Sequence, residues 1–152
     1  MEQFLSASMV ICEKVLNEQD GVLSAIRIVD VFYVQEIPKE ITEIEGLAIM
    51  EASIILAIRV SPPTQSERIL SLKISHPNGE TKEIFSKPVS LAGNPLIPKD
   101  SDVPRGTTLH IRLALTKRIL GTYIVRAFLD GEEIAKSPFT LLPPVQQKDV
   151  EH

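Results

Sequence analysis

The most constraining feature of the sequence is a strict alternation of apolar and polar residues in several short segments. In residues 108–116 (TLHIRLALT), every second side chain is leucine or isoleucine, and residues 68–75 (RILSLKIS) repeat the pattern. Because successive side chains leave opposite faces of a strand, this period of two indicates strands with one buried face. An apolar helical period never persists beyond two turns, so the sequence predicts little helix, with room for one short turn at 38–46.

Three further segments are unusually rich in apolar or β-branched residues. Residues 53–60 (SIILAIRV) are apolar on both faces, which predicts a central strand. Residues 21–37 (GVLSAIRIVDVFYVQEI) are dense in β-branched and aromatic side chains and predict one long or bulged strand over 21–35. The wider stretch 42–60 is unusually apolar, so it either deepens the core, covers the outer face of a sheet or meets a partner.

Turn signals separate these segments. Asp20-Gly21, Asn78-Gly79 and Asp130-Gly131 are dipeptides that accept the positive φ angles of two-residue hairpin turns. They predict hairpins over 72–85 and 123–139. The proline-bounded stretch 93–106 is the longest gap between strands, and we expect it to cross between two sheets.

The strand pattern predicts an all-β protein: an antiparallel two-sheet β-sandwich, immunoglobulin-like, of about eight or nine strands, with a closed barrel as the alternative. The sequence predicts a single domain over 1–142 and a mobile C-terminal tail over 143–152. The expected strands span 4–14, 21–35, 47–60, 67–76, 80–86, 107–117, 122–129 and 132–141, with a further one near 89–92.

The charge, the hydropathy and the single cysteine of the chain bear on its binding partners and its cellular compartment. The net charge of −4 and the absence of a run of more than two Lys or Arg disfavour nucleic acid, which needs clustered cations. No apolar stretch reaches the length of a membrane span, and the N-terminal segment lacks the Lys or Arg of a secretion signal. The single Cys12 rules out an intramolecular disulfide. We therefore expect a cytoplasmic protein.

Three segments carry a resemblance to a known family: 6–32 with an early cysteine before a glycine-turned hairpin, 71–84 with a Pro-x-Gly hairpin, and 121–141 with a Gly-x-Tyr strand that ends in Asp-Gly. These segments resemble an uncharacterised bacterial family of single-domain proteins, a domain of unknown function. The resemblance implies an immunoglobulin-like β-sandwich. It implies no catalysis and no ligand.

Catalytic and metal-binding motifs are absent from the sequence. His76, His110 and His152 form no metal-ligand spacing, and neither a nucleophile motif nor a phosphate-binding glycine loop is present. Cys12 lies in an apolar run, which favours a small buried side chain over a reactive thiolate. Tyr123 enters a late strand, where a packed ring with its hydroxyl bonded to a nearby loop is expected. The sequence predicts no cofactor.

One pair of carboxylates is a candidate for calcium. Asp100 and Asp102 are two residues apart in the longest loop, and end loops of β-sandwiches can supply the oxygen ligands that this cation needs. Two carboxylates are too few alone. Asp20, Asp30 or Asp130 would complete the site only if the topology brought them to the same end.

Two classes of function remain. The favoured one is a non-catalytic binding or assembly module that meets a protein partner or forms a homo-oligomer through a sheet face, an edge strand or the end loops. The alternative is a hydrolase-type enzyme whose carboxylates are gathered from loops, or a calcium-dependent sandwich domain. The absence of tryptophan and the presence of only two tyrosines disfavour a sugar-stacking surface.

Overall fold

The computed structural model describes residues 3–19, 22–36, 47–62, 67–98 and 100–145. These residues form strands and no helix, so they contain no helix that could span a membrane. The strands are β1 (Gln3–Asn17), β2 (Leu23–Ile28), β3 (Val31–Tyr33), β4 (Met50–Ser61), β5 (Arg68–Ser75), β6 (Thr81–Val89), β7 (Arg105–Leu115), β8 (Gly121–Leu129) and β9 (Glu132–Leu142). The all-β prediction is confirmed, while the segment 38–46 and most of the expected tail lie outside the described residues.

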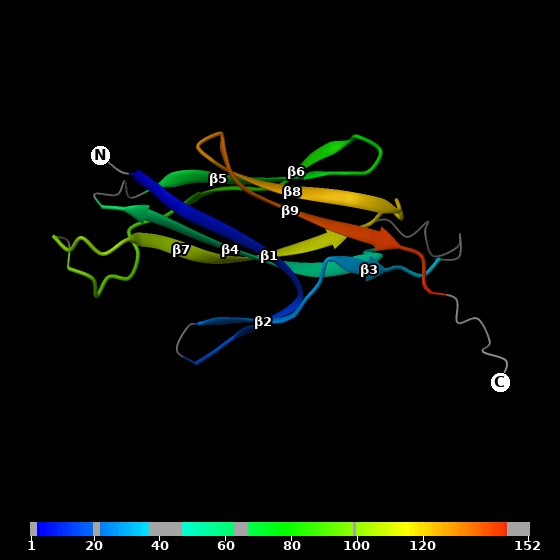
Figure 1. The fold of residues 1–152 in the computed structure, drawn as a ribbon, viewed down its shortest axis with the longest axis horizontal. Coiled ribbons are helices and arrows are strands. Elements are labelled where there is room, and N and C mark those ends of the chain that lie inside the picture. The colour runs from blue at the N-terminus through cyan, green and yellow to red at the C-terminus, as the bar shows by residue number, and fades with distance from the viewer. Residues whose placement is uncertain (1–2, 20–21, 37–46, 63–66, 99, 146–152) are drawn as a thin grey trace.

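The strands form two sheets that pack face to face (Figure 1). One sheet has four strands in the order β2-β1-β4-β7, and the other has five in the order β3-β9-β8-β5-β6. Because β4 lies between β1 and β7, the prediction of a central strand over 53–60 is confirmed. All pairings are antiparallel except that of β3 with β9, which is parallel. The expectation of a purely antiparallel arrangement is therefore wrong at this one pair.

The predicted long strand over 21–35 is also wrong, because the run divides into β2 and β3 in different sheets. The amide of Val29 still donates to Ile11 of β1, whereas the carbonyl of Asp30 already accepts from Thr140 of β9. Just before this point Arg27 adopts a positive φ of 55°, which interrupts the extended conformation. The chain thus changes sheets between two adjacent residues, a long-range effect that β-propensity does not reveal.

The core lies between the sheets and is built from the alternating apolar side chains. Tyr123 and Phe139 stack with ring centroids 5.0 Å apart, and the Phe32 ring meets Phe139 edge-on. Ile54 and Leu56 of β4 are completely buried, which shows that the apolar stretch 42–60 contributes to the core where it is described. One core therefore joins the strands of both sheets.

The two predicted hairpins form, with different turns. Asp130 and Gly131 both have positive φ, as a two-residue turn between β8 and β9 requires. Between β5 and β6 only Gly79 has positive φ, and its amide donates to the carbonyl of His76. Pro77 explains the difference, since its ring fixes a negative φ and places it at the second position of an ordinary turn.

The connection between β6 and β7 crosses from the five-stranded to the four-stranded sheet, as predicted. The strand expected near 89–92 does not exist separately, because Val89 ends β6 and the residues after it are irregular. Arg105, only 9% exposed, donates from its guanidinium to the carbonyls of Ala92 and Pro98. This side chain fixes the crossing loop to the beginning of β7.

Candidate functional site

The two sheets do not match in width, and the mismatch lies on one side of the molecule. β1 and β9 belong to different sheets and contact each other. From that point the four-stranded sheet continues with β4 and β7, whereas the five-stranded sheet continues with β8, β5 and β6. Among the described strands, the four-stranded sheet therefore ends one strand short of β6, and β6 meets it only where the beginning of β6 lies beside the end of β7.

The outer edge of β7 carries backbone groups without a strand partner in the described part of the chain. The carbonyl of Leu115 accepts from Ile49, so residue 115 directs its polar groups toward the β4 side. These directions alternate along a strand, and the pairing of β7 with β4 has no bulge. The residues that direct their N–H and C=O groups outward are therefore Gly106, Thr108, His110, Arg112 and Ala114. A Cβ on Gly93 of the crossing loop would lie only 3.6 Å from the Gly106 nitrogen, so the open part of the edge begins at Thr108.

The outer edge of β6, on the same side of the molecule, is protected. Ile84 is the extra residue of a bulge on β6, because Phe85 pairs with Leu72 and Glu83 with Lys73, and Pro88 lies opposite Ile69. The amide of Ile69 donates to the Asp130 carboxylate and its carbonyl accepts from the Asp130 amide, so both polar groups of Ile69 point away from β6. Pro88 therefore faces Ile69 without a ladder bond, and its missing N–H belongs to the open edge. Proline and bulges are the devices that prevent edge pairing, and β6 has both.

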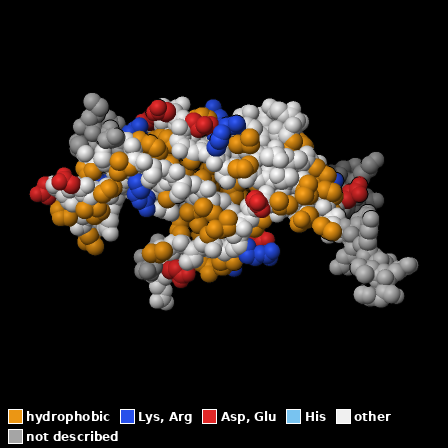
Figure 2. Space-filling view, viewed as in Figure 1, with side chains coloured by type: hydrophobic (Ala, Val, Ile, Leu, Met, Phe, Trp, Pro, Cys, Tyr) orange, Lys and Arg blue, Asp and Glu red, His pale blue; other side chains and the backbone are white. Residues whose placement is uncertain are grey.

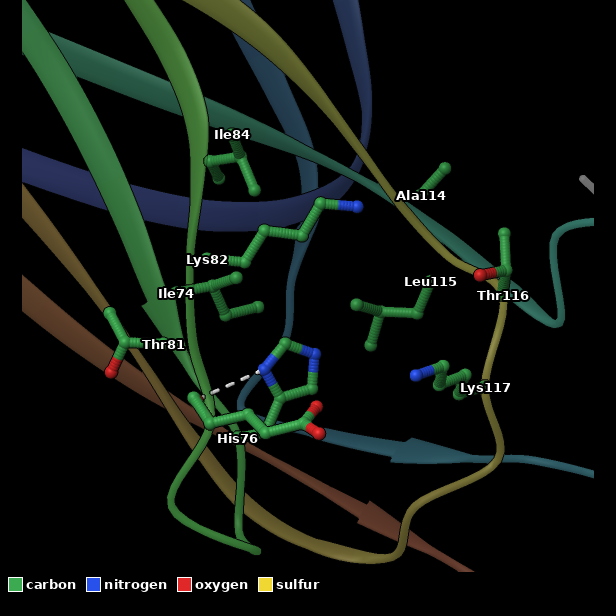
Figure 3. Close-up of a pocket in the computed structure, with 10 residues that line it drawn as sticks. Ile74, His76, Thr81, Lys82, Ile84, Ala114, Leu115, Thr116 and Lys117 are labelled. Carbon is green, nitrogen blue, oxygen red and sulfur yellow. Dashed lines mark hydrogen bonds between the residues drawn. The ribbon is translucent and has the colours of Figure 1, made fainter.

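A cavity of about 400 Å³ opens where the end of β7 meets the beginning of β6. Its apolar wall includes Ile74, Ile84 and Leu115. Lys82 comes from one sheet and Lys117 follows the last strand of the other, and both side chains point into the cavity (Figure 3). Neither ammonium makes a hydrogen bond or ion pair with any residue that the structure describes.

His76 lines the same cavity and is held in place by its surroundings. Its Nδ1 lies 3.3 Å from the carbonyl oxygen of Glu80, and its ring lies 5.3 Å from that of Tyr123. The Tyr123 hydroxyl donates to the carbonyl of Ile119, which is the loop contact expected from the sequence, and burial raises the pKa of this hydroxyl. The Glu80 carboxylate adds one negative charge to the cavity.

The structure brings no further described metal ligand to Asp100 and Asp102, the calcium candidates. Asp100 and Asp102 are both described, and both are exposed within the loop that crosses from β6 to β7. In the described ranges no group of three or more His, Cys, Asp or Glu side chains is arranged to hold a metal ion. Asp130 is engaged with Arg68 and the amide of Ile69. Calcium binding at Asp100 and Asp102 therefore stays a prediction.

Sequence reasoning missed a contact on the outer face of the four-stranded sheet. His110 Nε2 lies 2.9 Å from the Ser53 hydroxyl, in a serine–histidine pair. No described carboxylate bonds the other ring nitrogen, so the pair lacks the group that would orient the histidine as a base. Cys12 is completely buried nearby, its thiol lies 3.6 Å from the Ser53 carbonyl oxygen, and burial raises its pKa. A thiol in this state is a poor nucleophile.

The surface carries no dominant sign of charge on the face shown in Figure 2, where acidic, basic and apolar side chains are interspersed. Another cavity, of about 260 Å³, lies beside Phe4 and is lined by two acidic residues, Glu132 and Glu133. Neither this cavity nor the one beside Lys82 gathers the three carboxylates that would point to a hydrolase cleft.

Comparison with known proteins adds little. No family model matches the chain, and no curated protein matches it. Among solved structures, the chain is similar to the Pseudomonas fluorescens alkylpurine DNA glycosylase AlkC bound to DNA containing an abasic site analog, with 13% identity and a TM-score of 0.39. The alignment covers 88% of this chain and 30% of that one, so the chain spans less than a third of that protein.

Proposed function

We propose that this protein is a non-catalytic protein-binding module that accepts an extended segment of a partner protein on the open edge of β7. The observation that carries the proposal is the edge of β7, which no described strand covers from Thr108 to Ala114, at the side where the four-stranded sheet ends one strand short of β6. Its sequence, RGTTLHIRLAL, has no proline, no lysine and no bulge. Such an edge is a template for an added strand.

The backbone supplies the affinity in this mode of binding. Four residues of β7, at positions 108, 110, 112 and 114, direct N–H and C=O groups outward on the open part of the edge. An added strand would satisfy these groups and would also cover the part of the inward face of β6 that lies beyond the end of β7. Side chains of the segment on that side would enter the space beside Ile84 and Phe85, which are only half-buried. The module thus combines backbone pairing with a site for alternate side chains.

We also propose that the chain belongs to the uncharacterised bacterial family that it resembles, with an immunoglobulin-like sandwich and a cytoplasmic location. The corner-like hydrogen bond of Tyr123 and the two glycine-turned hairpins support the proposed family. The free and buried Cys12 is compatible with a reducing compartment.

The experiment is a selection of displayed random peptides on the wild-type protein, followed by binding to two variants. Arg112→Pro removes an outward N–H from the middle of β7, whereas Arg112→Ala removes the same charge and keeps the N–H. We expect the selected peptides to bind the alanine variant nearly as well as wild type and the proline variant at least about tenfold more weakly. In the complex, amide exchange at Thr108, His110 and Ala114 should slow.

Two outcomes would contradict the proposal. Selected peptides that bind Arg112→Pro as tightly as wild type would place the site elsewhere, and a failure to select any peptide would remove its basis. A concentration-dependent dimer of the wild type that Arg112→Pro dissociates would instead make a second copy of the chain the occupant of β7, the homo-oligomer alternative.

A further inference from the structure

We propose that the segment bound along β7 is acidic, with carboxylate side chains at two inward-facing positions on either side of a central apolar one. This inference rests on the proposed function, because it describes the side chains of the strand that β7 would accept. It follows from the face of β6 that the added strand would cover.

The inward face of β6 is defined by its pairing with β5. Leu70, Leu72 and Ile74 of β5 are buried and point into the core. Their partners across the ladder are Lys87, Phe85 and Lys82 respectively. Residues directly opposite in an antiparallel pair share a face of the sheet, so these three side chains of β6 also point inward. Lys82 lies beside the end of β7, and no described strand of the four-stranded sheet lies beyond β7 to cover the others.

The order of these side chains is basic, apolar, basic. Lys87 lies with its ammonium 5.7 Å from the centre of the Phe85 ring, and Lys82 lies at the opposite end, in the cavity with Lys117. None of the three lysines forms an ion pair with a described residue. Glu80 is the acidic residue that lines this cavity, so Lys82 and Lys117 leave an excess of positive charge there.

An added strand would have to satisfy this pattern with its own alternate side chains. Lys82, Phe85 and Lys87 oppose β5 positions that are spaced by two residues, which is the spacing of one face of a strand. The inward positions of the segment would therefore read acidic, apolar, acidic, each separated by one residue. In the antiparallel orientation, which the whole four-stranded sheet adopts, the first acidic residue lies near Lys82 and Lys117.

The same pattern disfavours a second copy of β7 as the occupant. The strand contains no Asp or Glu, and its inward side chains are the leucines and isoleucine at positions 109, 111, 113 and 115. A second β7 would cover the lysines of β6 with apolar side chains, at the cost of desolvating charges without pairing them. Charge complementarity therefore favours an acidic segment from another protein.

The test uses blocked peptides of about nine residues, so that neither terminus supplies a charge. One peptide carries glutamate, isoleucine and glutamate at alternate positions among threonines, and its partner peptide carries glutamine in place of both glutamates. Affinities would be measured from shifts of the β7 amide resonances in nitrogen-15 spectra. We expect the acidic peptide to bind about tenfold more tightly, with a difference that shrinks as salt is added.

Charge-reversed variants identify the lysines involved. Lys82→Glu combined with Lys87→Glu should remove the preference for the acidic peptide. The matched control is Lys73→Glu combined with Lys136→Glu, which makes the same charge change on the outer face of the five-stranded sheet and should keep the preference. Spectra of the free variants should coincide with that of wild type away from the substituted strands.

The outcomes separate this inference from the proposed function. Equal affinity for the two peptides, or a preference that survives Lys82→Glu with Lys87→Glu, would overturn the acidic segment and leave strand acceptance in place. If neither peptide shifted the β7 amides, both the inference and the proposed function would fall.

Discussion

Strands β6 and β7 are the two edges on one side of this molecule, and they treat their free backbone groups in opposite ways. β6 carries Pro88 on its open side and is paired across a bulge at Leu72 and Lys73. β7 is longer, and its pairing with β4 is regular from Arg105 to Leu115. The sequence of β7 alternates apolar and polar residues regularly, whereas that of β6 does not, and the open edge of β6 is distinguished by its proline and its bulge.

The contrast indicates which edge is available for pairing. An open strand edge exposes a protein to unwanted association, and β6 shows that this chain contains the means to prevent it. The same means are missing from β7, which lies beside a cavity and opposite an uncovered face of β6. We therefore expect the open edge of β7 to pair with a strand of another molecule. The following measurements test the assignment of the two edges.

The largest difference in stability is expected between proline substitutions at two neighbouring residues of β7. Leu113 directs its N–H toward β4 and its side chain into the core, so Leu113→Pro should lower the free energy of unfolding by at least about 3 kcal/mol. Arg112 directs its N–H outward, and Arg112→Pro should lower it by less than about 1 kcal/mol. Urea denaturation of both variants checks this, and similar losses would show that the open edge is assigned to the wrong residues.

The next comparison uses one glycine beside each edge. A Cβ at Gly106, the first outward position of β7, would lie 1.8 Å from the Ile58 carbonyl oxygen, so Gly106→Ala should cost about 3 kcal/mol. Gly79, in the turn before β6, has a φ of 92° but open space around it, and Gly79→Ala should cost only about 1 kcal/mol. Thermal unfolding of the two variants would show which is less stable. A lower melting temperature for Gly79→Ala than for Gly106→Ala would contradict the prediction.

A smaller effect is expected where the crossing loop is fixed. Arg105→Met leaves the carbonyls of Ala92 and Pro98 without their donor and should reduce stability by about 2 kcal/mol. Lys87→Met on β6 removes a charge that makes no ion pair among the described residues, and it should change stability by less than about 0.5 kcal/mol. Chemical denaturation of the pair provides the measurement. Equal effects would mean that the buried guanidinium does not fix the loop.

The smallest effect on stability is expected from the Asp130 carboxylate, which binds the amide of Ile69 on β5, the strand that pairs with β6. The amide of Ile69 donates to the Asp130 carboxylate and lowers its pKa below the ordinary value, burial opposes this shift, and Arg68 adds to it. A carboxyl with a lowered pKa in the folded state stabilises the protein above its ordinary pKa, and this contribution is lost as the pH falls through the folded value.

Asp130→Asn should therefore remove less than about 1 kcal/mol at neutral pH, because the Asp130 side chain is 43% exposed. The difference between wild type and variant should vanish in acid. Asparagine tolerates the positive φ of this position, so the substitution isolates the charge. Unfolding measured across acidic and neutral pH tests the sign, and a difference that grew on acidification would contradict it.

The sequence predicts the strands well and the site poorly, for a physical reason. Alternation alone identifies the buried face of β7 through residues such as Leu109 and Ile111, because side-chain direction is a local property. Strand order depends on pairings between distant segments, and no local pattern shows that β7 is an edge. The lysines of β6 are a sharper case. Lys82 and Lys87 are five residues apart and would lie on opposite faces of a regular strand, but the bulge places both on the inward face.

The unequal width of the two sheets has one more consequence. A strand that pairs with β7 does not abolish the edge but moves it outward by one strand spacing, about 4.8 Å. The growth of the assembly then depends on the bound segment and not on this protein. A segment with proline or charge along its outer side would end the sheet as a one-to-one complex, whereas an unprotected one would present a fresh template and allow the sheet to elongate.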